Sequence, residues 1–257
     1  MLLAFDLDKT IVTQNYELPK SIEKAIFQAR AAGHIITVIT GRARVAAADF
    51  LKQLEISEFY SVNHGALVIG KNELVLHHSR IPAQDAKSII EPFQTHPEVE
   101  FSFFEGDVFY VKNPADERWS WAQTQHRQVE RYEADLGLHA DKIVFSANGL
   151  TSVLHKQIRE QYPDFVTYLW EDGFLEITGK KADKGSALQL LADQLGVAQQ
   201  DVIAFGDGPN DITMIEWAGH SIAVGPHAHP EVVAAANERI AAPEANGVAH
   251  WLEQNLL

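Results

Sequence analysis

The sequence predicts an α/β protein in which a core built on a parallel sheet is interrupted by an inserted α+β domain. Short apolar runs alternate with amphipathic helical segments over residues 1–81, and the alternation returns over 180–257. Between these parts, over 82–179, pairs of strands joined by turn sequences replace it. A chain of 257 residues is long enough for two domains of these sizes. We therefore expect a core of 1–81 with 180–257 and a second domain of 82–179.

The first part of the core is expected to contain two strand–helix units, a third strand and a hairpin. Its strands are compact apolar runs, as is typical of strands buried on both faces, and they are expected at 2–5, 35–39, 60–62 and in a hairpin of 66–69 with 74–77. Its helices show apolar residues at helical spacing and are expected at 19–32 and 45–54. Because single strands alternate with helices, we expect a parallel sheet.

The insert is expected to combine helices with antiparallel hairpins. One hairpin is expected where strands at 101–105 and 108–112 flank Gly106-Asp107. A second is expected where strands at 166–170 and 174–178 flank Asp172-Gly173, a strong hairpin signal. The helical stretches of the insert are expected at 83–93, 119–136 and 150–162.

After Lys184 the strand–helix alternation resumes and completes the core. The strands expected here are apolar runs at 202–205 and 221–224. The expected helices are 187–195, 212–218, 230–237 and a last one around 248–256.

Charge and composition exclude several classes of function. Acidic residues outnumber basic ones by 35 to 21, and the resulting net charge of −14 disfavours a nucleic-acid partner. The absence of cysteine excludes disulfides, thiolate nucleophiles and cysteine-bound metals. No apolar run approaches the roughly 20 residues of a membrane span, and carboxylates follow the first residues too soon for a signal peptide. We therefore expect a cytoplasmic protein without a membrane partner.

Two carboxylates, Asp6 and Asp8, directly follow the first apolar run. Residues i and i+2 of an extended chain point to the same side, so both should emerge at the C-terminal end of the strand, where open α/β sheets bind ligands. An acidic turn is the alternative, but adjacent like charges require a cation or a shared proton. A calcium loop is disfavoured because Ile11 stands where that loop needs glycine.

Two further segments carry residues suited to a phosphate group. Thr40-Gly41-Arg42 ends the second strand and opens a helix, where free backbone N–H groups converge. Taken alone, this tripeptide is equally compatible with a simple helix cap. Lys184 lies just before another helix, although most lysines are solvated surface charges.

The segment Gly206–Asp211 follows the apolar strand at 202–205. Its glycines and proline are turn formers, so a purely structural loop is one interpretation. Asp207 and Asp211 nevertheless bring two more carboxylates to the C-terminal end of a core strand.

Taken together, these four motifs resemble the haloacid dehalogenase superfamily of phosphotransferases. With the insert between the second and third motifs, the whole chain is similar to the Cof-type members with a class IIB cap. The resemblance implies a Rossmann-like core with an inserted cap domain. It also implies a magnesium-dependent phosphatase that acts on a small phosphorylated metabolite through an aspartyl-phosphate intermediate.

The resemblance also implies a role for each motif residue. Asp6 would be the nucleophile and Asp8 the general acid/base. Mg²⁺ prefers oxygen ligands, which would come from Asp6, the carbonyl of Asp8 and Asp207, with Asp211 orienting a bound water. The residues implied to hold the substrate are Thr40, Gly41, Arg42, Lys184 and Asn210.

The sequence departs from the family pattern at two positions and leaves two other functions open. His64 precedes Gly65-Ala66 where family proteins usually have asparagine, and Lys9 stands where glycine is commonest. A phosphosugar mutase on the same fold is the first alternative function. A non-catalytic phosphosugar-binding protein is the second, and it is disfavoured because a sensor needs no acid/base such as Asp8 beside a nucleophile.

Overall fold

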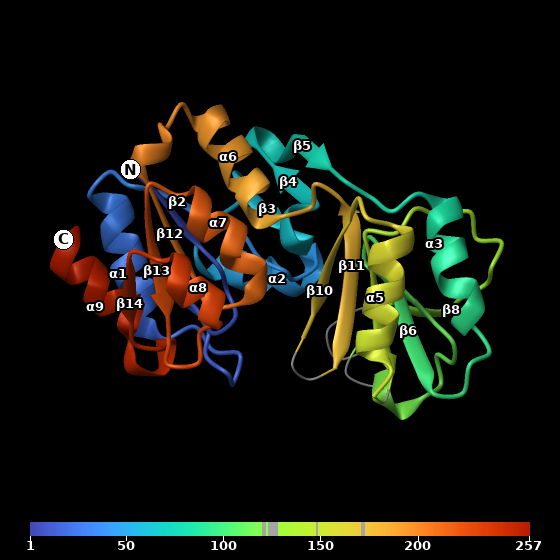
Figure 1. The fold of residues 1–257 in the computed structure, drawn as a ribbon. Coiled ribbons are helices and arrows are strands. Elements are labelled where there is room, and N and C mark those ends of the chain that lie inside the picture. The colour runs from blue at the N-terminus through green and yellow to red at the C-terminus, as the bar shows by residue number, and fades with distance from the viewer. Residues whose placement is uncertain (120–121, 123–127, 148, 171–172) are drawn as a thin grey trace. The chain divides into compact units, whose positions relative to one another are not determined.

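The computed structural model covers residues 1–257 and describes all of them except 120–121, 123–127, 148 and 171–172 (Figure 1). Contacts within the chain divide it into two compact units. The first contains residues 1–42, 47–77 and 183–257, and the second contains 43–46 and 78–182. Among the described residues no helix is both long enough and apolar enough to cross a membrane.

The first unit is built on a five-stranded parallel sheet, as the alternating apolar runs predict. Its strand order is β14 (Glu238–Ile240), β13 (His220–Val224), β12 (Val202–Gly206), β1 (Leu2–Phe5) and β2 (Ile35–Val38). β1 and β12 are buried along their whole length, and the rings of Phe5 and Phe205 stack 4.7 Å apart at the end of their pairing. The ends of β1 and β12 therefore lie side by side.

Helices cover both faces of this sheet (Figure 1). Along β1, Leu3 and Phe5 pack into one apolar cluster while Leu2 and Ala4 pack into another, because successive side chains of a strand point to opposite faces. The helices on the first face are α1 (Lys20–Ala31), α2 (Arg44–Gln53) and α9 (Gly247–Asn255). Those on the second are α6 (Lys184–Leu195), α7 (Ile212–Trp217) and α8 (Pro230–Ala235).

The third strand of the sequence belongs to a separate small sheet rather than to the parallel one. This sheet has the order β3 (Tyr60–Val62), β4 (Leu67–Ile69) and β5 (Val75–His78). β3 and β4 pair antiparallel, whereas a single parallel bridge between Ile39 and Ser61 links β3 to the chain beyond β2. The hairpin turn at 70–73 lies between β4 and β5, as expected.

The second unit contains a six-stranded mixed sheet and two helices of at least eight residues among its described parts. The sheet order is β10 (Phe165–Leu169), β11 (Phe174–Lys180), β9 (Lys142–Ala147), β6 (Val99–Glu105), β7 (Val108–Val111) and β8 (Gln128–Arg131). The helices α3 (Ala83–Ile90) and α5 (Thr151–Gln161) contribute to its apolar core. Both expected hairpins are present, although residues 171–172 of the second turn lie outside the described residues.

The helix expected at 119–136 is wrong from Gln128 onward, whereas Ala122 is helical as expected. A short 3₁₀ turn spans Glu117–Trp119, and Gln128–Arg131 forms the edge strand β8, parallel to β7. The rest of the segment up to 127, except Ala122, lies outside the described residues. Pairing with a neighbouring strand overrides the helical pattern of these polar residues.

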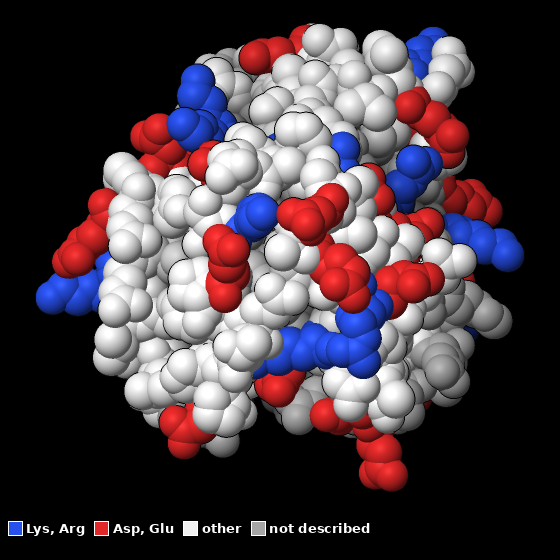
Figure 2. Space-filling view, turned by 90° about the vertical axis from the view of Figure 1, so that its right-hand side faces the viewer, with Lys and Arg blue, Asp and Glu red and all other residues white. Residues whose placement is uncertain are grey.

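Basic and acidic side chains are interspersed on the face shown in Figure 2. In the second unit, for example, the exposed Lys180 pairs with Asp164 at 2.7 Å. On this face, acidic side chains therefore lie among the basic ones.

We predict that Phe145→Ala lowers the free energy of unfolding by about 3–5 kcal/mol, because it leaves a cavity in the core of the second unit. Phe145 is fully buried and its ring contacts Phe93 at 5.4 Å between centroids. Val153→Ala is the matched control, since Val153 is 55% exposed on α5 and its loss should change stability by less than about 0.5 kcal/mol. Urea unfolding followed by circular dichroism measures both, and equal effects would contradict this account of the core.

Candidate active site

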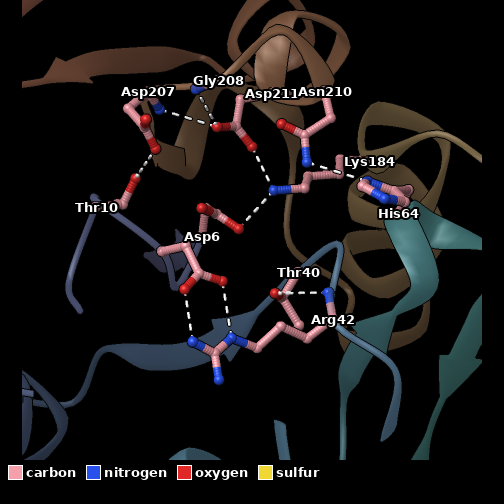
Figure 3. Close-up of polar contacts among 11 residues, drawn as sticks. Asp6, Thr10, Thr40, Arg42, His64, Lys184, Asp207, Gly208, Asn210 and Asp211 are labelled. Atoms are coloured by element: carbon pink, nitrogen blue, oxygen red, sulfur yellow. Dashed lines mark hydrogen bonds and ion pairs between the residues drawn. The ribbon is translucent and has the colours of Figure 1, made fainter. Parts of the chain in front are cut away.

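The residues of the four motifs gather at one edge of the parallel sheet (Figure 3). Asp6 follows β1, Thr40 follows the end of β2, and Asp207 follows β12. Because β12, β1 and β2 are neighbours and parallel, their carboxyl ends lie together. Lys184 joins them from the first residue of α6.

Lys184 lies at the centre of this group and is completely buried. Its Nζ is 2.6 Å from Oδ1 of Asp6 and 2.5 Å from Oδ1 of Asp211. Burial alone would lower the pKa of Lys184, but Asp211 and Asp6 more than compensate and raise that pKa well above its ordinary value. The ammonium group is therefore charged at every physiological pH.

Three buried carboxylates, those of Asp6, Asp207 and Asp211, offer oxygen atoms that all lie within 4.8 Å of one another. Burial, opposed by Lys184 but aided by the neighbouring acids, raises the pKa of Asp6 well above its usual value. Burial and the charge of Asp211 raise the pKa of Asp207 to about 7. One lysine cannot balance three carboxylates, so this all-oxygen cluster fits a divalent cation such as Mg²⁺.

Asp211 and Asp207 are each held in place by hydrogen bonds. Oδ2 of Asp211 accepts from the backbone N–H groups of Asp207 and Gly208, both at 2.9 Å. Oδ1 of Asp207 accepts from the hydroxyl of Thr10 at 3.1 Å. Thr10 belongs to the first motif, so this bond ties the first and last motifs together.

Asp6 pairs with Lys184, whereas Asp8 pairs with Arg42. The guanidinium of Arg42 donates from Nε to Oδ2 of Asp8 at 2.8 Å and from Nη2 to Oδ1 at 2.6 Å. The guanidinium carbon lies 4.7 Å from the ring centre of Phe50 and 5.4 Å from that of Tyr16. The planar fork of arginine suits both contacts and fixes the plane of the carboxylate.

The second motif is held against the loop after β3. Thr40 is buried, and its hydroxyl accepts from the backbone N–H of Arg42 at 3.2 Å. His64, also buried, donates its backbone N–H to the carbonyl of Thr40 at 3.0 Å. The side chain of Asn210 lies 3.0 Å from Nδ1 of His64.

Lys9 has left-handed backbone with φ of 59°. A non-glycine residue with this backbone conformation carries strain of about 1–2 kcal/mol. This strain gives a physical reason why glycine is commonest at the position of Lys9 in the family that the sequence resembles. Its N–H donates to the carbonyl of Val12 at 2.7 Å, so the turn closes on itself directly after Asp8.

Three contacts of the site have no local signal in the sequence. The contacts of Arg42 with the rings of Tyr16 and Phe50, and the contact of His64 with Asn210, are formed only by the fold. The contact of Thr10 with Asp207 does have a local signal. Thr10 stands two residues after Asp8 in the first motif, and this spacing indicates that Thr10 belongs among the candidate site residues.

A family model described as haloacid dehalogenase-like hydrolase matches residues 3–252. The pyridoxal phosphate phosphatase YbhA of Escherichia coli K12 is 27% identical over 100% of this chain and 98% of its own. The phosphatase YwpJ of Bacillus subtilis is 26% identical over 99% of each chain.

Solved structures share the fold. A haloacid dehalogenase-like hydrolase from Bacteroides thetaiotaomicron superposes with a TM-score of 0.86 at 21% identity, covering 98% of both chains. A structure described as a HAD subclass IIB sugar phosphatase superposes with a TM-score of 0.83 at 23% identity, again covering 98% of both chains. At these identities the likeness shows the arrangement of helices and strands.

We predict that Mg²⁺ raises the melting temperature more at about pH 8 than at about pH 5. An unfolded aspartate loses its proton near pH 4, but folded Asp207 loses it near pH 7, so the metal-free protein loses stability as pH rises between these values. Above pH 7 Asp207 is charged and a cation relieves its repulsion with the neighbouring carboxylates, whereas below pH 7 the cation must displace the proton of Asp207.

Thermal melts with and without Mg²⁺ at both pH values measure this effect, and Asp207→Asn should remove most of the pH difference. Asp201→Asn is the control, because Asp201 is an exposed acid outside the cluster. If Mg²⁺ raised the melting temperature equally at both pH values, Asp207 would not have the raised pKa that its burial and the charge of Asp211 give it.

Proposed function

Because the chain belongs to the haloacid dehalogenase-like hydrolases, we propose that it is a magnesium-dependent phosphatase of a small phosphorylated metabolite. The observation that carries the proposal is the buried Lys184 between Asp6 and Asp211 at the carboxyl edge of the sheet. An anionic nucleophile must approach an anionic phosphate, and this lysine lowers the repulsion between them. The relatives named as phosphatases support the same reaction class.

The metal would be held by Asp6, Asp207 and the backbone carbonyl of Asp8, with Asp211 fixing the loop that carries Asp207. When bound, Mg²⁺ neutralises negative charge on the phosphate oxygens and on the carboxylates around them. The excess negative charge of the buried cluster is the feature that fits it to this ion.

Asp6 would attack phosphorus, forming an Asp6–phosphate bond while the bond to the leaving oxygen breaks. Asp8 would give its proton to that leaving alkoxide, and would then take a proton from the water that hydrolyses the aspartyl-phosphate. The paired hydrogen bonds from Arg42 fix the position of the Asp8 carboxylate. Lys184, 2.6 Å from Asp6, remains charged throughout and also holds the phosphate.

The phosphate group would be held by Thr40, Gly41, Lys184 and Asn210, together with Arg42, whose guanidinium pairs with Asp8. The named substrates of the relatives differ in their organic part and share a phosphate, as in the pyridoxal phosphate phosphatase and a Bacillus subtilis phosphatase for 5-amino-6-(5-phospho-D-ribitylamino)uracil. We therefore assign phosphate recognition to the motifs and recognition of the organic group to residues 82–179, which we propose form an inserted cap domain.

Hydrolysis of p-nitrophenyl phosphate in the presence of Mg²⁺ is the first test. Activity should disappear in EDTA and return with added Mg²⁺, because uncompensated carboxylates repel the phosphate. Release of inorganic phosphate distinguishes a phosphatase from a mutase, which would return the phosphate to a sugar, and from a non-catalytic binding protein. Full activity in the chelator would refute the metal-dependent mechanism.

The two carboxylates of the first motif should respond differently to substitution. Asp6→Asn removes the nucleophile and should reduce kcat by at least about a thousandfold with every substrate. Asp8→Asn should slow esters of poor leaving groups by about 10²–10⁴-fold but should retain more of the burst of p-nitrophenol, whose release needs little protonation. Asp201→Asn should behave like the unchanged protein. Substantial turnover by the Asp6 variant would place the nucleophile elsewhere.

A further inference from the structure

The loop after β3 has three consecutive residues with left-handed backbone. The φ angles of Asn63, His64 and Gly65 are 51°, 60° and 99°. Only glycine adopts this conformation without cost, and strained residues persist where the surrounding structure holds them. Strain of this kind, directly beside the phosphate-binding motifs, raises the question of what the loop does there.

The loop contacts the second and third motifs through its backbone. The N–H groups of Asn63 and His64 donate to the carbonyls of Arg42 at 2.8 Å and Thr40 at 3.0 Å. Gly65 lies so close to Asp183, the residue before Lys184, that an added Cβ would stand 2.2 Å from the Asp183 carbonyl oxygen. The loop is thus fixed against two of the segments that surround the substrate phosphate in the proposed function.

The side chain of His64 contacts two further residues of the phosphate-binding motifs, Gly41 and Asn210. It is 2% exposed, and a Cβ added to Gly41 would stand 2.3 Å from its ring, so the ring packs directly on the Gly41 backbone. Nδ1 of His64 lies 3.0 Å from Nδ2 of Asn210, which is also buried (Figure 3). An amide nitrogen can only donate, so Nδ1 accepts, and the ring carries its proton on Nε2.

We propose that His64 is a positioning residue of the phosphate site: it accepts one amide hydrogen of Asn210 and so directs the other toward the phosphate. An amide NH₂ group is planar and has two hydrogens, so fixing one fixes the direction of the second. The same ring packs against the backbone of Gly41. This inference rests on the proposed function, because it assigns Asn210 to the phosphate.

The test compares His64→Gly with His64→Asn. Both residues accept left-handed backbone readily, but only asparagine keeps an acceptor near the position of Nδ1. His64→Gly should raise the Kd for inorganic phosphate, measured by calorimetry with Mg²⁺, and the KM for p-nitrophenyl phosphate by about tenfold each. Its kcat should change by less than about threefold, and His64→Asn should recover most of the affinity.

A double-mutant cycle with Asn210→Ala separates positioning from a general structural role. If His64 acts through Asn210, the double variant His64→Gly/Asn210→Ala should bind phosphate no more weakly than Asn210→Ala alone. His155→Leu is the matched control, since it removes another histidine, one whose Nε2 lies 2.9 Å from the hydroxyl of Thr167. It should leave both constants unchanged.

Three results would overturn the proposal: unchanged phosphate affinity in His64→Gly, equal losses in the glycine and asparagine variants, or additive losses in the cycle. If His64→Gly does not fold, Asn210→Ala and His64→Asn still decide, because the first must weaken phosphate binding while the second retains it. If the unchanged protein does not hydrolyse p-nitrophenyl phosphate, the proposed function fails, while the calorimetric comparison still decides the role of His64.

Discussion

The buried ion cluster around Lys184 is the constraint on which the rest of the first unit depends. A charged ammonium group inside a protein is costly unless carboxylates meet it directly, and the same holds for the carboxylates. Lys184 is fully buried against Asp6 and Asp211, and each of the three would be strongly destabilising without the others. Lys184 offsets part of the negative charge at this edge of an otherwise apolar sheet, and the proposed Mg²⁺ would offset the rest.

Two features of the neighbouring residues allow this cluster to form: a cap on helix α6, and glycines where a side chain would not fit. Asp183 caps α6 by accepting from the N–H of Ser186 at 2.9 Å, which places Lys184 at the first position of the helix. Gly185 allows α6 to approach α7 closely, since an added Cβ would stand 2.5 Å from the carbonyl oxygen of Thr213. Gly206 similarly leaves room for Asp211, with only 2.6 Å between its added Cβ and that side chain.

How much could be predicted from the sequence depends on how local each feature is. Strands such as β1 and β12 are apolar runs followed directly by acids, so both the strand and its functional end are visible within ten residues. β9 was not identified, because its place between β6 and β11 depends on pairing with distant segments. The pairing of Asp8 with Arg42 and the contact of His64 with Asn210, 146 residues away, are likewise products of the fold.

The parallel pairing of β1 with β12 has a consequence for the order in which the chain can fold. It places Leu2 beside Val202, so β1 gains the partner between itself and the rest of the sheet only after most of residues 1–257 have been synthesised. The second unit, by contrast, draws nearly all its residues from one continuous stretch, 78–182, and has its own apolar core. During synthesis that stretch can complete its sheet before β12 has been made. Until then the edge of β1 that pairs with β12 remains unpaired. β1 is therefore among the last strands of this sheet to be paired on both sides, and while it is unpaired its apolar edge is open to chaperones and to aggregation.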